Sequence, residues 1–259
     1  MIRITVVTIT YQAERVLQRT VDSVLHQTYR HVEHLIIDGA SKDGTLAMAE
    51  SYRQLSVAAD NGHEVIISSE PDRGIYDAMN KGLQRATGDY IVFMNAGDTF
   101  YEATTIERVA GATGATGATE PAVIYGDTAM TDGEGHFLRL RRHRPPETLT
   151  WKSFKQGMLV CHQAFYARRD IAARLPYNLK YRHSADVDWC IRVMKEADRL
   201  GLPLVNTHAV LANFETGGDT TQHHQDSLWE RFHVMADHYG LLQTVLLHGW
   251  FVVRAIVKR

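Results

Sequence analysis

One carboxylate stands where a buried strand is expected to end. Residues 90–93 (Tyr-Ile-Val-Phe) are apolar in a row, which is typical of a strand covered on both faces of a sheet. Residues 95–98 (Asn-Ala-Gly-Asp) follow with the composition of a turn and place Asp98 at the carboxyl end of that strand. Ligands bind at this end of the strands in open α/β sheets, and carboxylate oxygens suit hard divalent cations. We therefore expect Asp98 to hold Mg²⁺ or Mn²⁺.

Strands rich in β-branched residues alternate with amphipathic helices before this point. The strands are expected at residues 4–10, 32–37 and 65–67. Each helix between them has one apolar face, and Ser41 or Asp43 could cap the second one. The alternation predicts parallel pairing in a doubly wound α/β sheet. No G-x-G-x-x-G sequence follows the first strand, which argues against a dinucleotide-binding fold.

The alternation weakens in the second half of the chain. A strand is expected at residues 122–125, a segment at 137–141 could pair nearby, and a basic loop runs over 139–144. No shift in composition marks an independent domain. We therefore expect the region up to about residue 220 to complete the same α/β domain as a mixed half.

Composition narrows the class of protein and its compartment. The chain has 259 residues and a formal net charge of −2, without the basic excess of a nucleic-acid-binding protein. Its two cysteines, Cys161 and Cys190, are too few for a disulfide framework and suggest a reducing, cytoplasmic compartment. The chain begins with a strand pattern, so we expect no signal peptide, and no apolar run reaches the ~18 residues of a membrane-spanning helix.

The last residues, 241–259, are apolar nearly all round when drawn as a helix, with a tryptophan midway and cations at the end. An interfacial helix on an anionic membrane has this composition. A terminal helix docked on the protein core or in a dimer interface would also have it. Both interpretations stay open at this stage.

Four blocks resemble family-2 inverting glycosyltransferases of the GT-A fold. Residues 8–11 and 36–45 are similar to the opening of that family, whereas 70–82 and 94–98 look like a bacterial polysaccharide subgroup that includes colanic-acid-type transferases. The resemblance implies a nucleoside-diphosphate-sugar donor and a hydroxyl acceptor on a glycan or a lipid-linked glycan, at the cytoplasmic face of a membrane. It also implies the domain limits: a transferase domain over 1–220, with a nucleotide-binding half (1–100) and an acceptor half (121–220), and a C-terminal helical extension (221–259).

The resemblance also assigns roles to residues of the first half. It implies that the donor nucleotide sugar contacts Thr8, Tyr11, Asp38, Asp72 and Asn95. Asp38 would accept a hydrogen bond from a base N–H, although Asp-Gly after a strand is also an ordinary turn. The family usually has a pair of aspartates at the end of the fourth strand, and here only Asp98 is left. Mg²⁺ tolerates one carboxylate because it keeps water and phosphate ligands; alternatively, Asp98 caps a helix starting near residue 102.

Inversion at the anomeric carbon requires a base that removes the proton of the acceptor hydroxyl. Asp186 aligns with the catalytic aspartate of the family, with Ala185 in place of a frequent glutamate. An acid there could also simply favour the first turn of a helix capped by Ser184. Asp188, one residue out of helical phase, is the alternative base.

Histidines near this segment are further candidates. Residues 161–166 match a His-Gln strand of the family beneath the acceptor site, so His162 and Gln163 are expected to contact the acceptor. His162 and His183 are rival bases because histidine titrates near neutrality. Residues 214–221 resemble a loop that closes over the donor, and the adjacent histidines at 223–224 are weak candidates for a late metal ligand.

Two other functions compete with sugar transfer. A nucleotidyltransferase would need a glycine-rich phosphate loop after the first strand, and residues 10–13 (Thr-Tyr-Gln-Ala) are not such a loop. A non-catalytic module that binds sugar nucleotides is suggested by the loss of the second aspartate and by Ala185.

Overall fold

The computed structural model describes residues 1–117, 119–216 and 224–257. Its strands are β1 (Ile4–Thr10), β2 (Val32–Asp38), β3 (Glu64–Ser69), β4 (Tyr90–Phe93), β5 (Thr99–Phe100), β6 (Val123–Thr131), β7 (Phe137–Leu140), β8 (Phe165–Arg168) and β9 (Leu204–Glu215). The α-helices are α1 (Leu17–Leu25), α2 (Thr45–Ala59), α3 (Ile75–Arg85), α4 (Thr105–Ala112), α5 (Arg169–Ala172), α6 (Ala185–Leu200), α8 (His224–Tyr239) and α9 (Leu241–Val257). Short 3₁₀ helices are η1 (Thr113–Thr116), η2 (Trp151–Gln156) and η3 (His162–Ala164).

The strands of the first half pair as the sequence predicts. β1 lies between β2 and β4 and is parallel to both, and β3 is parallel to β2. Every residue of β1, β2 and β4 is buried, in keeping with a parallel sheet covered on both faces. The prediction of a mostly parallel, doubly wound arrangement for this half is confirmed.

The second half extends the same sheet in a mixed manner. The order is β3-β2-β1-β4-β8-β6-β9-β5, with β7 paired to β6. β8 is antiparallel to both β4 and β6, whereas β6 and β9 are parallel. The predicted mixed half is therefore present. The His-Gln strand that the resemblance implies at residues 161–166 overlaps β8, whereas the sequence analysis did not indicate the long β9.

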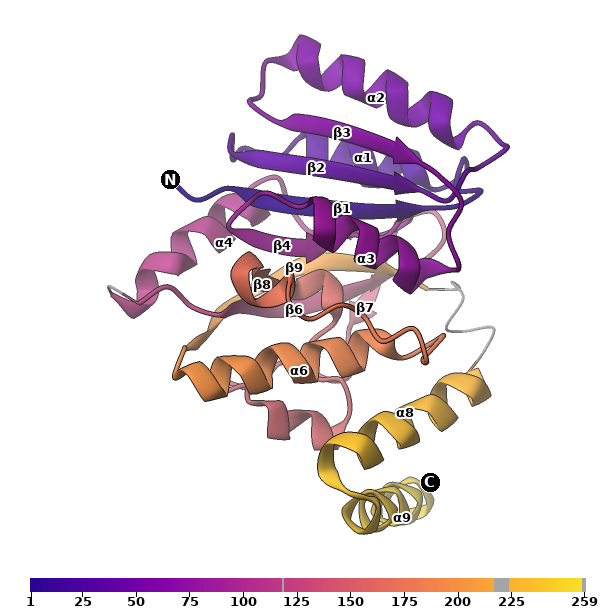
Figure 1. The fold of residues 1–259 in the computed structure, drawn as a ribbon, viewed down its shortest axis with the longest axis vertical. Coiled ribbons are helices and arrows are strands. Elements are labelled where there is room, and N and C mark those ends of the chain that lie inside the picture. Colours follow the sequence, from indigo (N-terminus) through magenta and orange to yellow (C-terminus); the bar gives the residue numbers. More distant parts are fainter. Residues whose placement is uncertain (118, 217–223, 258–259) are drawn as a thin grey trace.

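Helices cover both faces of the sheet (Figure 1). On one face, Leu17 and Val21 of α1 pack with Tyr52 of α2. On the other face, α3 and α6 pack against the sheet, and Trp189 of α6 contacts Phe93 of β4 edge to face. α8 and α9 lie beyond α6, at the far end of the molecule from α2 (Figure 1).

Several helix starts differ from the sequence predictions. Ser184 occupies the N-cap position of α6, but its hydroxyl bonds to the carbonyl of Ser227 instead of capping the helix. The N-cap of α2 is Gly44, and the Asp43 carboxylate accepts the next N–H, that of Thr45. None of the helices in the described part of the chain is long and apolar enough to cross a membrane.

Candidate active site

The strand order creates a switch point between β1 and β4. β2 lies on one side of β1 and β4 on the other, so the segments that follow β1 and β4 diverge at their carboxyl ends. Open α/β sheets bind ligands at such a point. Tyr11 follows β1 directly and Asn95 follows β4, which places both predicted contacts at this end of the sheet.

Tyr11 and Asp72 lie together on either side of Gly39. A Cβ atom on Gly39 would stand 2.6 Å from Asp72 Oδ2 and 3.2 Å from Tyr11 Cδ2, so only glycine permits this close approach. Tyr11 is 66% exposed, so its ring can contact a planar ligand. Asp72 is held by the N–H of Gly74, 2.8 Å from its Oδ1. The structure thus brings these two predicted donor contacts together.

Thr8 and Asp38 lie beneath the surface, and their contact with the donor stays a prediction. Thr8 is completely buried and its hydroxyl is 2.8 Å from Nε2 of His34. Asp38 is 1% exposed, and its carboxylate accepts hydrogen bonds from Thr10, Ser41 and Ser69. Burial acts to raise the pKa of Asp38, but these hydrogen bonds hold it below its usual range. Asp38 therefore stabilises the loop that follows β2, whereas Thr8 joins β1 to β2.

Asp98 is buried in the segment that leads from the end of β4 to β5. Its Oδ2 accepts a 2.6 Å hydrogen bond from Gln163 Nε2, and its Oδ1 accepts a 3.0 Å bond from the N–H of Glu215. Burial raises the pKa of Asp98 to about 6, which these hydrogen bonds only partly oppose. The carboxylate does not cap α4, which begins at Thr105 with Thr104 at its N-cap.

Asp98 fits a divalent cation as a single carboxylate ligand. Among the side chains that the structure describes, no three His, Cys, Asp or Glu are grouped so that they could hold a metal ion. Each carboxylate oxygen has more than one acceptor site, so Asp98 retains free lone pairs. Burial raises its pKa, and a cation beside the carboxylate would oppose that effect. One carboxylate, with phosphate and water oxygens, is a donor set that Mg²⁺ accepts.

Asp186 is the centre of a second cluster. Its Oδ1 accepts a 3.1 Å hydrogen bond from the Tyr76 hydroxyl, and its Oδ2 lies 3.3 Å from Nδ1 of His162. Nε2 of His162 is in turn 3.3 Å from the Asn95 side-chain nitrogen. Burial acts to raise the pKa of Asp186, but the hydrogen bond and charge of His162 and the charge of Arg231 hold it below its usual range. The predicted base is therefore ionised at neutral pH and linked to the end of β4.

Aromatic stacking positions Tyr76 beneath Asp186. The ring of Tyr76 stacks on Tyr177 with centroids 5.5 Å apart, and Tyr177 stacks on Trp189 at 5.0 Å. Asn80 of α3 holds the loop that carries Tyr177, because its side chain bonds to both the N–H and the carbonyl of Tyr177. A Cβ on Gly82 would collide with Val7, so α3 lies directly on β1.

Asp188 has a structural role. Its Oδ1 is 2.8 Å from Nε2 of His238 in α8, and its Oδ2 accepts a 2.7 Å bond from Arg192. The residue is 4% exposed, so both oxygens are committed to the junction of α6 and α8. This geometry does not support Asp188 as the alternative base.

The predicted acceptor contacts lie between the two clusters. His162 and Gln163 belong to η3, so they precede β8 instead of lying in a strand. His162 contacts Asp186, and Gln163 contacts Asp98. Among the described residues, the buried side-chain oxygens of Gln163 and Asn95 have no hydrogen-bond partner. A buried polar atom without a partner is a place where water or a ligand can donate a hydrogen bond.

Several residues at the site had no signal in the sequence. Glu230 of α8 accepts hydrogen bonds from the N–H groups of Arg182 and His183, just before the helix that carries Asp186. Glu215 pairs with Arg19 at 2.8 Å, and its carboxylate would collide with a Cβ on Gly97, whose φ is +103°. These partners are far apart in the chain. Residues 217–223, which include most of the predicted donor loop and the first of the two adjacent histidines, lie outside the described residues; His224 begins α8.

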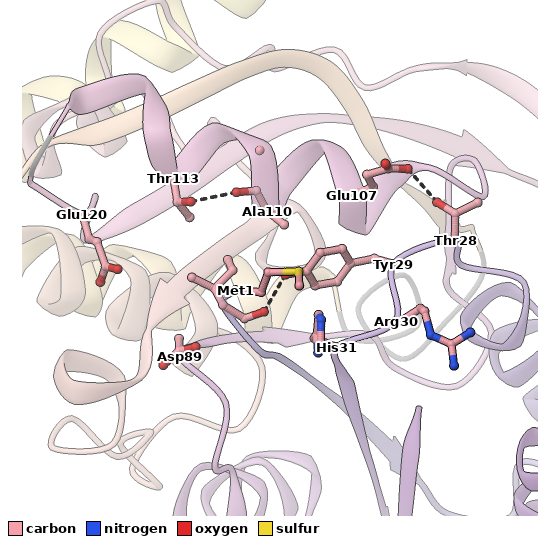
Figure 2. Close-up of a pocket in the computed structure, with 12 residues that line it drawn as sticks. Met1, Thr28, Tyr29, Arg30, His31, Asp89, Glu107, Ala110, Thr113 and Glu120 are labelled. Atoms are coloured by element: carbon pink, nitrogen blue, oxygen red, sulfur yellow. Dashed lines mark hydrogen bonds between the residues drawn. The ribbon is translucent and has the colours of Figure 1, made fainter. Parts of the chain in front are cut away.

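A pocket of about 800 Å³ lies at the opposite, amino end of the strands (Figure 2). Tyr29 stands in its middle and bonds to the carbonyl of Ile2, while Asp89 and Glu107 line its sides. None of the predicted site residues lines this pocket. The size of the pocket therefore does not identify the site, which follows from the switch point and its polar clusters.

Comparison with known proteins decides the family. The family model described as glycosyl transferase family 2 matches residues 5–175, which is more than half of the chain. This chain belongs to glycosyltransferase family 2. The PGL/p-HBAD biosynthesis glycosyltransferase of Mycobacterium bovis (strain BCG / Pasteur 1173P2) is 33% identical to this family-2 glycosyltransferase, over 96% of this chain and 92% of its own. The amylovoran biosynthesis glycosyltransferase AmsB of Erwinia amylovora is 27% identical over 79% of this chain and 66% of its own.

Solved structures agree with this family-2 glycosyltransferase in fold. A crystal structure of S. aureus TarS residues 1–349 superposes with a TM-score of 0.68 at 14% identity, covering 96% of this chain and 72% of that one. The mannosyltransferase PcManGT from Pyrobaculum calidifontis, in complex with GDP-Man and Mn²⁺, superposes with a TM-score of 0.60 at 15% identity. The match covers 97% of this chain and 75% of that one. The chain spans 38% of a longer TarS chain. These neighbours confirm the GT-A fold expected from the sequence, and the family assignment sets aside a nucleotidyltransferase or a purely binding function.

Proposed function

We propose that this glycosyltransferase moves a sugar from a nucleoside-diphosphate-sugar to a hydroxyl group, with inversion at the anomeric carbon. One observation carries the proposal: Asp186 of the second half is linked through His162 to Asn95, at the end of β4 where the first half would bind the donor. A base beside the donor-binding end of the sheet can remove the acceptor proton during in-line attack.

The donor would lie across the loops after β1, β2 and β4. Tyr11 is exposed beside Asp72, and this pair offers a flat ring and a carboxylate to the nucleoside. The free amide oxygens of Asn95 and Gln163 would accept hydroxyls of the sugar. Asp38 would also hold the loop after β2 in place beneath the donor.

The diphosphate would lie near Asp98. A divalent cation held by this carboxylate would neutralise the charge that builds on the departing nucleoside diphosphate. Mg²⁺ and Mn²⁺ both suit an oxygen donor set of this kind. Asp98 also receives the Gln163 amide, so the same residue would connect diphosphate binding with the acceptor side.

The acceptor would be a glycan or a lipid-linked glycan of a bacterial surface polymer or glycolipid. The names of two relatives support this class, since one serves PGL/p-HBAD biosynthesis and the other amylovoran biosynthesis. We further propose that the enzyme works at the cytoplasmic face of the membrane and touches it through α9. Leu242 and Leu246, one turn apart on that helix, are 76% and 66% exposed.

A thermal-shift screen followed by a transfer assay tests the proposal. The panel contains UDP-glucose, UDP-galactose, UDP-N-acetylglucosamine and GDP-mannose, each with Mn²⁺ or with EDTA. One donor should raise the melting temperature by several degrees, because a ligand that binds only the folded state stabilises it. With that donor and a set of octyl glycosides, a product of inverted configuration should form. A product of retained configuration, or donor binding without any transfer, would contradict the proposal.

A further inference from the structure

We propose that Glu215 supplies a second carboxylate to the divalent-cation site and binds the cation together with Asp98. This inference rests on the sugar transfer proposed above and names the residue that completes its cation site. Only Asp98 is left of the pair of aspartates expected at the end of β4. The other carboxylate would come from the end of β9, 117 residues beyond Asp98 in the chain.

The Glu215 carboxylate lies where a side chain on residue 97 would otherwise lie. Its Oε2 would be 2.3 Å from a Cβ atom on Gly97, which is too close for two atoms that are not bonded. Gly97 also has a φ of +103°, a conformation that residues with side chains rarely adopt. Residue 97 therefore carries no carboxylate of its own, and Glu215 brings one to the same place from another strand.

Hydrogen bonds hold Glu215 against the segment that carries Asp98. The N–H of Glu215 donates to Oδ1 of Asp98 at 3.0 Å. The Thr20 hydroxyl of α1 accepts from the N–H of Gly97 and donates to the carbonyl of Asp98, so this segment is fixed from both sides. Burial leads the effects that raise the pKa of Asp98, and the charge of Glu215 adds to them. A divalent cation bound by both carboxylates would relieve this repulsion.

Arg19 holds the Glu215 carboxylate from the side of α1. Its Nη2 donates to Oε2 of Glu215 at 2.8 Å, and its Nη1 donates to the carbonyl of Gly133 at 2.7 Å. A carboxylate has about four acceptor sites, so one bond from Arg19 leaves others for a metal ion. Carboxylates that bind metals are usually held by hydrogen bonds of this kind.

Gln163 is a third polar group at the same place. It is 1% exposed, and its Nε2 donates to Oδ2 of Asp98 at 2.6 Å. Among the described residues, the buried oxygen of this amide has no hydrogen-bond partner. A water molecule on a bound Mg²⁺ could donate to such an oxygen, because Mg²⁺ usually keeps several waters. No three acidic, histidine or cysteine side chains are grouped in the described part of the chain, so phosphate and water would complete the ligand set.

A purely structural role for Glu215 makes a different prediction. If its ion pair with Arg19 only ties β9 to α1, removing either partner should affect cation binding equally. If Glu215 is a ligand, its own loss should weaken cation binding much more. The loss of Arg19 removes a positive charge beside the cation, which partly offsets the loss of the ion pair.

Three variants separate these roles without a need for acceptor. Glu215→Gln retains an oxygen for Arg19, Arg19→Met removes the ion pair, and Glu134→Gln removes the same charge from the turn between β6 and β7, where the Glu134 side chain is 83% exposed. EPR titrations give the affinity of each variant for Mn²⁺ in the presence of UDP or GDP, whichever the wild type binds. We expect Glu215→Gln to weaken Mn²⁺ binding by ~100-fold or more, since even the loss of a group behind a ligand costs ~10–100-fold. Arg19→Met should lose less than tenfold, and Glu134→Gln should equal wild type.

Two outcomes would overturn the inference. One is a loss in Glu215→Gln that exceeds the loss in Arg19→Met by less than tenfold, and the other is an equal loss in Glu134→Gln. Melting temperatures in EDTA show whether each variant is folded. Should Glu215→Gln not fold, Glu215→Asp replaces it under the same criterion, because it withdraws the carboxylate by one methylene and retains the charge.

The wild-type enzyme in the same titrations tests the proposed function separately. If it binds neither nucleotide, the proposed donor site is contradicted. If it binds a nucleotide together with Mn²⁺ and Glu215→Gln binds both equally well, only the assignment of Glu215 is wrong.

Discussion

Nε2 of Gln163 donates a 2.6 Å hydrogen bond to Oδ2 of Asp98. Gln163 precedes β8 and Asp98 follows β4, and these two strands are antiparallel neighbours in the sheet. The bond joins the carboxylate proposed to serve the diphosphate with the segment that carries His162. Because His162 contacts Asp186, changes at Asp98 and Asp186 should affect different steps of one connected site.

Replacement of Asp98 should alter the pH dependence of stability. Burial raises the pKa of Asp98 to about 6 in the folded protein, so the folded state binds this proton more tightly than the unfolded chain. The resulting stabilisation is fully present below about pH 4 and is lost as the pH rises through about 6. Over that range the contribution of Asp98 to the free energy of unfolding falls by ~3 kcal/mol. Asp98→Asn has no charge to bury, and the Gln163 amide can rotate to accept from the new side chain.

Denaturant unfolding in EDTA at pH 4.5 and pH 7.5 measures this effect. At pH 7.5 the free energy of unfolding of Asp98→Asn should equal or exceed that of wild type. From pH 4.5 to pH 7.5 this free energy should fall less in the variant than in wild type. Asp60→Asn is the matched control, since Asp60 is an exposed acid whose side chain is 98% accessible. In the same variant, the additional thermal shift that Mn²⁺ gives with UDP should disappear. An unchanged Mn²⁺ response would remove Asp98 from the cation site.

Asp186→Asn should lower turnover and leave donor binding near wild type. Loss of a general base typically costs ~10²–10⁴ in kcat. Asp188→Asn is the control because Asp188 pairs with His238 and Arg192 in a buried position. That change should lower the melting temperature, while kcat per folded molecule stays near the wild-type value. The opposite pattern would make Asp188 the base. Both variants are measured by steady-state kinetics and by donor thermal shift.

The exposed side of α9 should bind anionic vesicles. Thr244 is buried, and Phe232 of α8 contacts His248 of α9 with ring centroids 5.0 Å apart, so one side of α9 is docked. Leu242→Glu should weaken cosedimentation with phosphatidylglycerol vesicles at least tenfold and leave the melting temperature nearly unchanged, because that side chain is 76% exposed. Gln243→Glu adds the same charge to a neighbouring position as a control. Equal binding by Leu242→Glu and wild type would leave α9 without a membrane function.

The sequence by itself determined the parallel half of the sheet and the family. Long β-branched runs such as residues 4–10 have a strong local preference for buried strands, and the four blocks in their order and spacing resemble one family. The strand tip that carries Asp98 followed from the same local pattern. The position of Asp186 in the first turn of a helix was also evident from nearby residues.

Only the tertiary structure decided which of the predicted site residues are exposed and which are buried in hydrogen bonds with the protein. Tyr11 is open whereas Asp38 is enclosed by three side chains, and both belong to motifs that look equally suited to a ligand. His162 meets Asp186 across 24 residues of chain, and Gln163 meets Asp98 across 65. Such contacts depend on strand order and on the packing of α6 and α8. No local preference encodes them, because side-chain partners are chosen by the fold as a whole.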